Sequence, residues 1–114
     1  MFKVEYKGLF EETPITSVFT EFLEKSLESD PEVAYIDADL MALIGVRDVA
    51  AKYPDRVFNT GIMESNMVGV AAGLSLIGMK PYIHSFAAFI ARRAFDQIFF
   101  VWSVCTQKYA YNRK

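Results

Sequence analysis

Apolar residues recur along the chain with two spacings, which predict helices alternating with short strands. The first helix is expected to start at Thr13-Pro14, with proline in the first turn, and to end at Ser29-Asp30-Pro31. Between these points the apolar residues stand at helical spacing. They are Val18, Phe19, Phe22, Leu23 and Leu27.

Three short apolar runs predict strands, and further helical segments follow them. The expected strands are Val33 to Ile36, Arg56 to Phe58 and Lys80 to Ser85. The expected helices are Val46 to Tyr53, a helix from about Glu64 to Ile77 capped by Gly78, and a third major helix from Phe86 onward. Such alternation predicts an α/β fold with a parallel sheet and helical crossovers.

Polar residues gather where the predicted strands end. Asp37 and Asp39 follow the first strand, residues 59–64 follow the second, and residues 84–89 follow the third. Ligands of open parallel sheets bind at the carboxyl ends of the strands. The three segments are therefore expected at one edge of the sheet, which predicts a binding site there.

The helix beginning near Glu64 is apolar nearly all round, so we expect it to be buried. Gly69 and Gly73 stand four residues apart and share one face of it. Because neither has a side chain, another backbone can approach this face closely, in the same molecule or in a partner.

Composition narrows the class of protein. The chain has 114 residues, 53% of them hydrophobic, and a formal net charge of −2. We therefore expect one packed domain over residues 1–114 and no nucleic-acid binding. The single cysteine, Cys105, favours a reducing, cytoplasmic location. The most apolar run, Met67 to Met79, is shorter than the roughly 20 residues that span a bilayer, so no membrane contact is expected.

Glu64 allows two interpretations. With Gly61 as the N-cap, Glu64 lies in the first helical turn, where the helix dipole stabilises a carboxylate. Apolar neighbours such as Met63 and Met67 instead desolvate the carboxyl group, which raises its pKa. If desolvation dominates, Glu64 stays protonated and can donate a hydrogen bond.

Other candidate residues lie near the third strand end. Phe86 and Phe89 share a helix face, where they either pack in the core or form an apolar slot for a flat heterocycle. His84, the only histidine, is either structural or a contact to substrate or cofactor. Without a second histidine or a cysteine cluster, no metal site is expected. Asp37 is expected to shape a loop, whereas Asp39 is a candidate site residue.

The last predicted helix carries four polar residues on successive turns. They are Arg92, Arg93, Asp96 and Gln97. Arg92 and Asp96 have the spacing of an ion pair, and all four residues are expected to brace the fold or an interface. The chain has no GxGxxG, GxxxxGK[ST] or GxSxG motif, so something other than these motifs must hold the phosphates of any phosphorylated cofactor.

Several motifs, taken in order, resemble the pyrimidine-binding domain of thiamine diphosphate enzymes, and specifically the transketolase family. They are Ala38-Asp39-Leu40, Phe58-Asn59-Thr60-Gly61-Ile62, Glu64-Ser65-Asn66-Met67, Ala71-Ala72-Gly73-Leu74, Lys80-Pro81-Tyr82, Ser85-Phe86-Ala87-Ala88-Phe89 and Arg93-Ala94-Phe95-Asp96-Gln97-Ile98. The match is close over the C-terminal two-thirds of the chain and looser before it. The resemblance implies a three-layer α/β/α fold with a mostly parallel sheet.

The resemblance also implies residue roles. Glu64 falls on the glutamate that hydrogen-bonds a pyrimidine ring nitrogen of thiamine diphosphate and promotes the imino tautomer of the cofactor. Phe86 and Phe89 fall on the aromatic pocket around that ring, and Asp39 falls on the aspartate near the thiamine site. His84 is the candidate for a substrate contact.

The chain departs from the family in several places. Ser65 stands where glutamine is usual, and one extra residue separates the phenylalanine pair from Arg93, as in the C-terminal chains of split, two-subunit transketolases. Residues 101–114 do not resemble the family, so the chain is expected to be truncated. The diphosphate-binding domain is absent, so a partner subunit is expected to supply it and to bind magnesium.

The implied function is transfer of two-carbon ketol units between sugar phosphates, as in the pentose phosphate pathway. Activity is expected only with the diphosphate-binding subunit, which shares the cofactor with this chain. The expected assembly is a homodimer or a heterotetramer. Alternatives within the fold are deoxyxylulose-phosphate synthase and the β subunit of 2-oxoacid dehydrogenases. An alternative of another class is a non-catalytic remnant or a dimerising interaction module.

Overall fold

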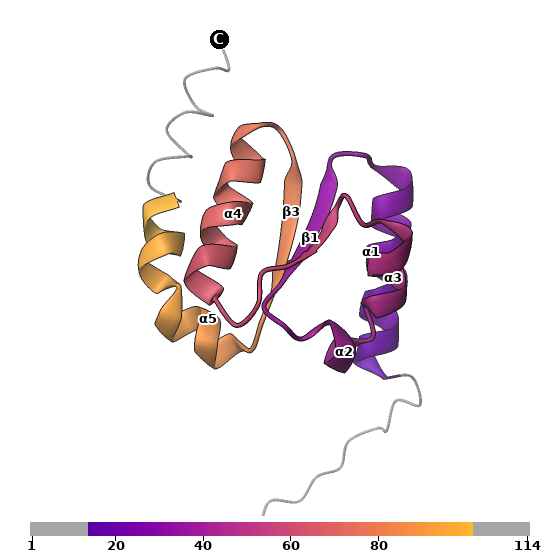
Figure 1. Cartoon of the computed structure of the whole chain (residues 1–114), viewed down its shortest axis with the longest axis horizontal. Coiled ribbons are helices and arrows are strands. Elements are labelled where there is room, and N and C mark those ends of the chain that lie inside the picture. The colour runs from indigo at the N-terminus through magenta and orange to yellow at the C-terminus, as the bar shows by residue number, and fades with distance from the viewer. Residues whose placement is uncertain (1–13, 102–114) are drawn as a thin grey trace, which may run out of the picture.

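The computed structural model describes residues 14–101, and its helices and strands alternate as predicted (Figure 1). The elements are α1 (Ile15–Ser29), β1 (Val33–Asp37), α2 (Met41–Ile44), α3 (Arg47–Lys52), β2 (Val57–Asn59), α4 (Glu64–Leu76), β3 (Lys80–His84) and α5 (Ala87–Arg93). A further helical segment covers residues 95–101. The predictions about Cys105 and about the tail beyond residue 101 lie outside the described residues.

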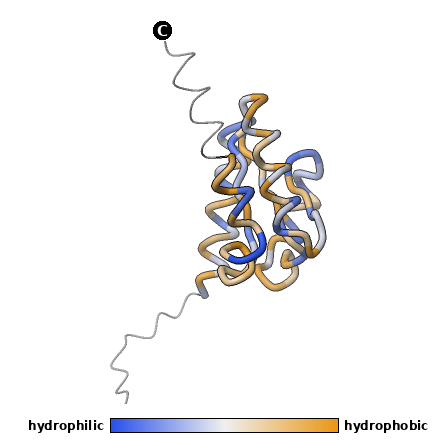
Figure 2. The backbone as a smooth tube through the Cα atoms, turned by 90° about the vertical axis from the view of Figure 1, so that its left-hand side faces the viewer, coloured by the Kyte–Doolittle hydropathy of each residue, from blue (hydrophilic) through white to orange (hydrophobic). Residues whose placement is uncertain are grey.

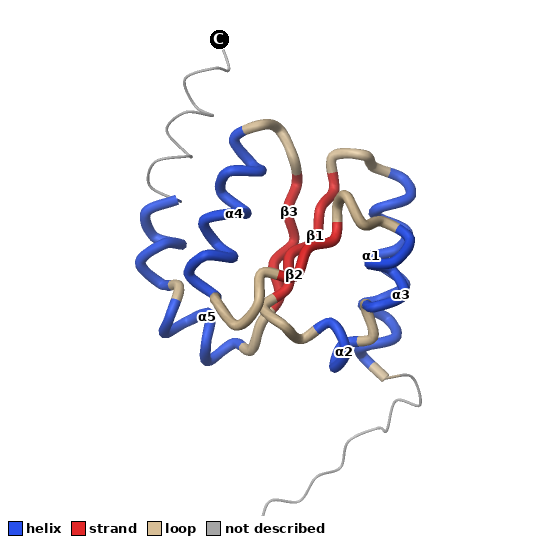
Figure 3. The backbone as a smooth tube through the Cα atoms, viewed as in Figure 1, coloured by secondary structure: helices blue, strands red, loops and turns tan. Residues whose placement is uncertain are grey.

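The three strands form one parallel sheet in the order β2-β1-β3. In the central strand, Tyr35 pairs with Val57 on one side and with Tyr82 on the other. Helices α1, α2 and α3 lie on one face of the sheet, and α4 and α5 lie on the other (Figures 1 and 3). The α/β fold with three layers and a parallel sheet is thus confirmed.

Strand β1 divides the core into two clusters because successive side chains of a strand point to opposite faces. Tyr35 packs with Leu23 and Val49 on the face covered by α1 and α3. Ile36 packs with Met67 on the face covered by α4. Full burial of a side chain such as Leu23 contributes about 1.5–3 kcal/mol. Figure 2 shows hydrophobic residues along most of the chain, the outer helices included.

Most element boundaries fall within one residue of the prediction. The exception is the four-residue α2, which is too short to give a periodic signal. Helix α4 ends at the expected glycine: Gly78 has φ +97°, its N–H bonds the carbonyl of Ser75 at 3.1 Å, and the N–H of Met79 bonds that of Leu74 at 3.0 Å. These two bonds satisfy carbonyls that the helix end leaves free.

Two local predictions are wrong. The N-cap of α4 is Met63, because Gly61 adopts φ +75° in the preceding turn and its carbonyl accepts the Met63 N–H at 2.7 Å. The last helix is interrupted at the buried Ala94, so Arg92 and Asp96 do not share one continuous helix. The predicted pairing of those two residues on successive turns therefore does not apply.

Helix α4 is buried on one face only, contrary to the prediction. Its buried residues are Glu64, Met67, Val68 and Ala71. Gly69 and Gly73 are exposed, and nothing lies within 4 Å of a Cβ placed on either. Helix α4 packs on the sheet and on α5, and Gly69 lines a cavity with Asp96, Gln97, Phe100 and Val101 of the helical segment 95–101. No helix within residues 14–101 is long and apolar enough to cross a membrane.

Candidate functional site

Glu64 begins α4 and is buried at the edge where the strands end, with only 2% of its surface exposed. The hydroxyl of Ser85, the residue after β3, donates to Oε1 of Glu64 at 3.2 Å. From the end of α5, Nη1 of Arg93 donates to Oε2 at 3.1 Å and lies 3.3 Å from Oε1. Residues from three parts of the chain therefore meet at one carboxylate.

The pKa of Glu64 lies below its ordinary value. The main cause is a hydrogen bond from its own backbone N–H, and the guanidinium of Arg93 and the hydroxyl of Ser85 act in the same direction. Burial acts in the opposite direction but does not dominate. Of the two interpretations of Glu64, stabilisation of the carboxylate at the helix start therefore prevails in this chain, and Glu64 is ionised at neutral pH.

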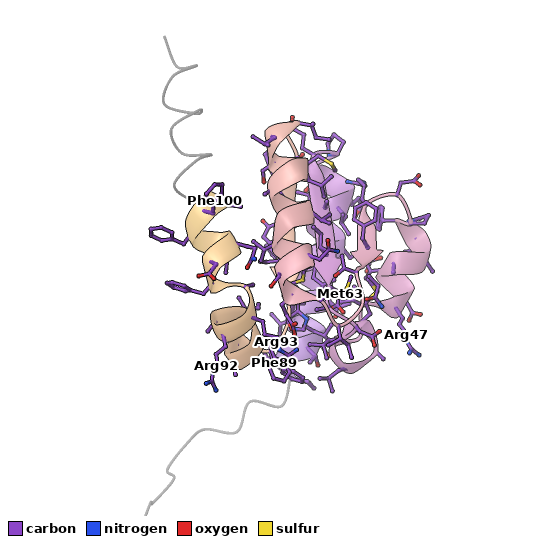
Figure 4. All side chains as sticks on the ribbon, turned by 60° about the vertical axis from the view of Figure 1, so that its left-hand side comes forward. Arg47, Met63, Phe89, Arg92, Arg93 and Phe100 are labelled. Atoms are coloured by element: carbon purple, nitrogen blue, oxygen red, sulfur yellow. The ribbon has the colours of Figure 1, made fainter. Side chains whose placement is uncertain are left out.

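Phe86 and Phe89 lie beside this carboxylate and are not core residues. Their rings meet edge to face, with centroids 5.7 Å apart. They are 48% and 37% exposed, so ring surface is open to a ligand. The guanidinium of Arg93 lies over the Phe89 ring, 4.1 Å from its centroid. Figure 4 shows Arg93 and Phe89 together below the start of α4, near Met63, whereas Arg92 points away.

Asp39 lies in the turn after β1 in an unusual backbone conformation. Its φ is +66°, the only positive value for a non-glycine residue in the described part of the chain. Asn59 stabilises this turn, since its Nδ2 donates to Asp39 Oδ1 at 3.0 Å and its Oδ1 accepts the Asp39 N–H at 3.1 Å. The same oxygen accepts the Gly61 N–H at 2.9 Å. Strained residues of this kind occur often at functional sites.

His84 lies on the opposite face of the sheet from Glu64. Its Nδ1 is 3.1 Å from Oδ2 of Asp37, which is fully buried and faces it in register across β1 and β3. Tyr35 donates its hydroxyl to the same oxygen at 2.9 Å, and the Leu40 N–H donates to the other oxygen of Asp37. Because burial raises the pKa of Tyr35, this hydroxyl remains a donor.

The structure therefore unites some of the predicted site residues and separates others. Hydrogen bonds and ring contacts link Glu64, Ser85, Arg93, Phe89 and Phe86 on the side of α4. His84 lies with Asp37 and Tyr35 on the side of α1, and Asp39 lies between the ends of β1 and β2.

Sequence reasoning missed two of these roles. The sequence predicts a bracing role for Arg93, but its guanidinium contacts the carboxylate of Glu64. The sequence predicts a loop-shaping role for Asp37, but its carboxylate anchors His84. The in-register pairing of Asp37 with His84 was available once the strands were placed, because both residues end parallel neighbours. The contact of Arg93 with Glu64 gives no such signal in the sequence.

The donor set suits an aminopyrimidine ring. A buried carboxyl group can share a proton with a ring nitrogen, and two partly exposed rings can contact a flat heterocycle. For a metal ion the chain offers less: residues 14–101 contain no group of three or more His, Cys, Asp or Glu side chains able to hold one.

Residues 11–111 match the family described as transketolase, pyrimidine binding domain. The chain is 39% identical over 88 residues to a 6-deoxy-6-sulfo-D-fructose transketolase subunit of Clostridium sp. (strain MSTE9). It is 38% identical over 86 residues to a 1-deoxy-D-xylulose-5-phosphate synthase of Parafrankia sp. (strain EAN1pec). These matches cover 77% and 75% of this chain, but 27% and 13% of those proteins.

A solved structure titled split gene transketolase, inactive beta4 tetramer, is similar in fold, with a TM-score of 0.64 and 40% sequence identity. The match covers 72% of this chain and 27% of the solved one. The chain thus spans about a quarter of the length of its transketolase relatives and less of the synthase.

Proposed function

The chain belongs to the transketolase pyrimidine-binding domain family, whose members are parts of thiamine diphosphate-dependent enzymes, and we propose that it serves in two-carbon ketol transfer between sugar phosphates. Glu64 carries this proposal: it is a buried carboxylate at a helix start, beside two open aromatic rings. These residues fit the aminopyrimidine of thiamine diphosphate.

Each candidate site residue has a defined role in the proposed function. Glu64 holds a proton at the pyrimidine ring nitrogen, and Phe86 and Phe89 contact the faces of the ring. Asp39 presents an exposed carboxylate at the strand ends, near the positively charged part of thiamine. His84 contacts the sugar phosphate through its Nε2, because its Nδ1 is engaged by Asp37. When bound, thiamine diphosphate supplies the carbon nucleophile that takes up the ketol unit.

A separate chain completes the site in this proposal. It holds the diphosphate and the magnesium ion. In the cytoplasm this chain forms either a homodimer or, with the separate chain, a heterotetramer. Support comes from the relatives, since one is named a transketolase subunit and another a split gene transketolase. The chain is expected to be inactive alone.

Two other functions have specific support. The similarity to 1-deoxy-D-xylulose-5-phosphate synthases favours the same pyrimidine-binding residues, which form this chain's half of the cofactor site (the half-site), with a different pair of substrates. The similar structure titled an inactive beta4 tetramer favours a non-catalytic assembly of identical chains. The exposed part of α4 around Gly73 offers a surface for such an assembly.

Cofactor binding tests the proposal. Titration calorimetry of thiamine diphosphate and magnesium into this chain mixed with the diphosphate-binding subunit of a split transketolase should show binding that neither chain gives alone. Phe89→Ala should weaken binding, whereas Phe99→Ala, also exposed but on the helix beyond the site, should not. Binding unaffected by Phe89→Ala would contradict the assignment of the pocket.

A further inference from the structure

We propose that Arg93 is a positioning residue that controls access to Glu64. Its guanidinium holds the carboxylate while the half-site is empty, and it must withdraw before the pyrimidine ring can pair with Glu64. This inference rests on the proposed function and adds that the side chain of Arg93 competes with the pyrimidine ring for Glu64.

The guanidinium contacts both groups that the pyrimidine needs. Its Nη1 lies 3.1 Å from Oε2 and 3.3 Å from Oε1 of Glu64. Its central carbon lies 4.1 Å from the centroid of the Phe89 ring. A flat ring that stacks on Phe89 and hydrogen-bonds Glu64 therefore requires the space and the contacts that Arg93 holds.

The two partners of this ion pair differ in their freedom to move. The side chain of Glu64 is 2% exposed, whereas that of Arg93 is 49% exposed. The half-exposed guanidinium can turn into solvent when a ligand replaces it at the carboxylate, but the buried carboxylate cannot follow it. A ligand that displaces one of the two must displace Arg93.

The backbone of Arg93 is held while its side chain is free to turn. The hydroxyl of Ser65, one residue after Glu64, donates to the carbonyl of Arg93, and the adjoining Ala94 is fully buried. The contact between α4 and α5 therefore persists when the guanidinium leaves. Only the side chain of Arg93 needs to move, so ligand binding does not require the backbone contact between α4 and α5 to break.

The chemistry of the ring explains why displacement matters. An unprotonated pyrimidine nitrogen is an acceptor, so it needs a donor on Glu64. A carboxylate paired with a guanidinium is ionised and has no proton to donate. Withdrawal of Arg93 removes one of the contributions that lower the pKa of Glu64, so the ring gains both access and a group that can share a proton.

Binding of the aminopyrimidine alone tests the inference. The probe is 4-amino-5-(hydroxymethyl)-2-methylpyrimidine, titrated into the full chain and followed by NMR, with amide spectra to verify folding. Arg93→Ala should bind the probe about tenfold more tightly than the wild type, since a charge-assisted contact no longer competes. Arg93→Lys, which keeps the cation, should stay nearer the wild type. The matched control Arg92→Ala removes an exposed arginine of the same helix and should change nothing.

The chemical shift of the side-chain carboxyl carbon (Cδ) of Glu64 provides a second readout, since it reports the ionisation and contacts of the carboxyl group and should move in Arg93→Ala but not in Arg92→Ala. The same comparison is made for thiamine diphosphate in the complex with the diphosphate-binding subunit. Tighter binding of either ligand by Arg93→Ala supports the inference. Equal or weaker binding overturns it and leaves the proposed function intact. Failure of both ligands to bind any variant overturns the proposed function, and the inference with it.

Discussion

Arg93 and Glu64 form an ion pair with an Nη1–Oε2 distance of 3.1 Å, although 29 residues separate them in the sequence. The contact joins the end of α5 to the start of α4, at the edge where the three parallel strands end. Together with the backbone N–H of Glu64, it favours the ionised form of the carboxylate on which the proposed function depends. In the proposed function, the two residues must separate before a pyrimidine ring can hydrogen-bond Glu64.

The low pKa of Glu64 predicts how stability depends on pH. Because the folded-state pKa is below the ordinary value of 4.5, the ionised residue stabilises the fold above that value. This contribution is lost as the pH falls from about 4.5 through the folded-state pKa. The free energy of unfolding, measured with urea, should therefore fall more steeply over this pH range for the wild type than for Glu64→Gln. Parallel pH profiles for the two proteins would contradict the prediction.

Tyr35→Phe should destabilise the fold by about 1 kcal/mol, because Asp37 is fully buried and loses one of its hydrogen-bond donors. Urea denaturation measures the change. Tyr82→Phe is a matched control, since Tyr82 pairs with Tyr35 in register but is exposed. An equal effect of the two substitutions would show that the hydroxyl of Tyr35 has no special role.

The anchoring of His84 predicts its tautomer. Asp37 accepts hydrogen bonds only, so neutral His84 must carry its proton on Nδ1 and leave Nε2 as an acceptor. Nitrogen NMR of the imidazole should show this tautomer at a pH where the ring is neutral. In Asp37→Ala, which removes the acceptor, the preference should disappear, and a persistent Nδ1–H tautomer there would refute the anchoring.

Gly78→Ala should destabilise the fold by about 1–2 kcal/mol, since Gly78 has φ +97° and alanine is strained in that region. Gly73→Ala should instead stabilise the free chain by up to about 1 kcal/mol, because Gly73 lies within α4 with open space around it. Thermal unfolding distinguishes the two. Destabilisation by Gly73→Ala would indicate a close contact at this face that the described residues do not show.

Structural features that depend on local periodicity could be predicted from the sequence. The order of helices and strands, the parallel sheet and the position of Glu64 at a helix start all follow from apolar spacing and from glycine and proline signals. The length of α4 was also predicted well, because Gly78 ends a helix for a reason visible in the sequence.

The remaining features depend on contacts between distant segments. The break at Ala94 coincides with the hydrogen bond from Ser65 to the carbonyl of Arg93, 28 residues away. The separation of His84 from Glu64 on opposite faces follows from the alternation of β3, where Ser85 points towards Glu64 and His84 towards Asp37. The partial burial of α4 could not be predicted, since an apolar helix surface does not show whether the same chain or another one covers it.

Reconstituted ketol transfer tests the central claim most directly. The chain is mixed with the diphosphate-binding subunit of a split transketolase, thiamine diphosphate and magnesium, and transfer from a ketose phosphate to an aldose phosphate is measured. We predict activity in the mixture and in neither chain alone, reduced at least about 100-fold by Glu64→Gln, since the proton held by this residue is essential. A folded chain that forms the complex but gives no transfer, or gives transfer unchanged by Glu64→Gln, would contradict the account.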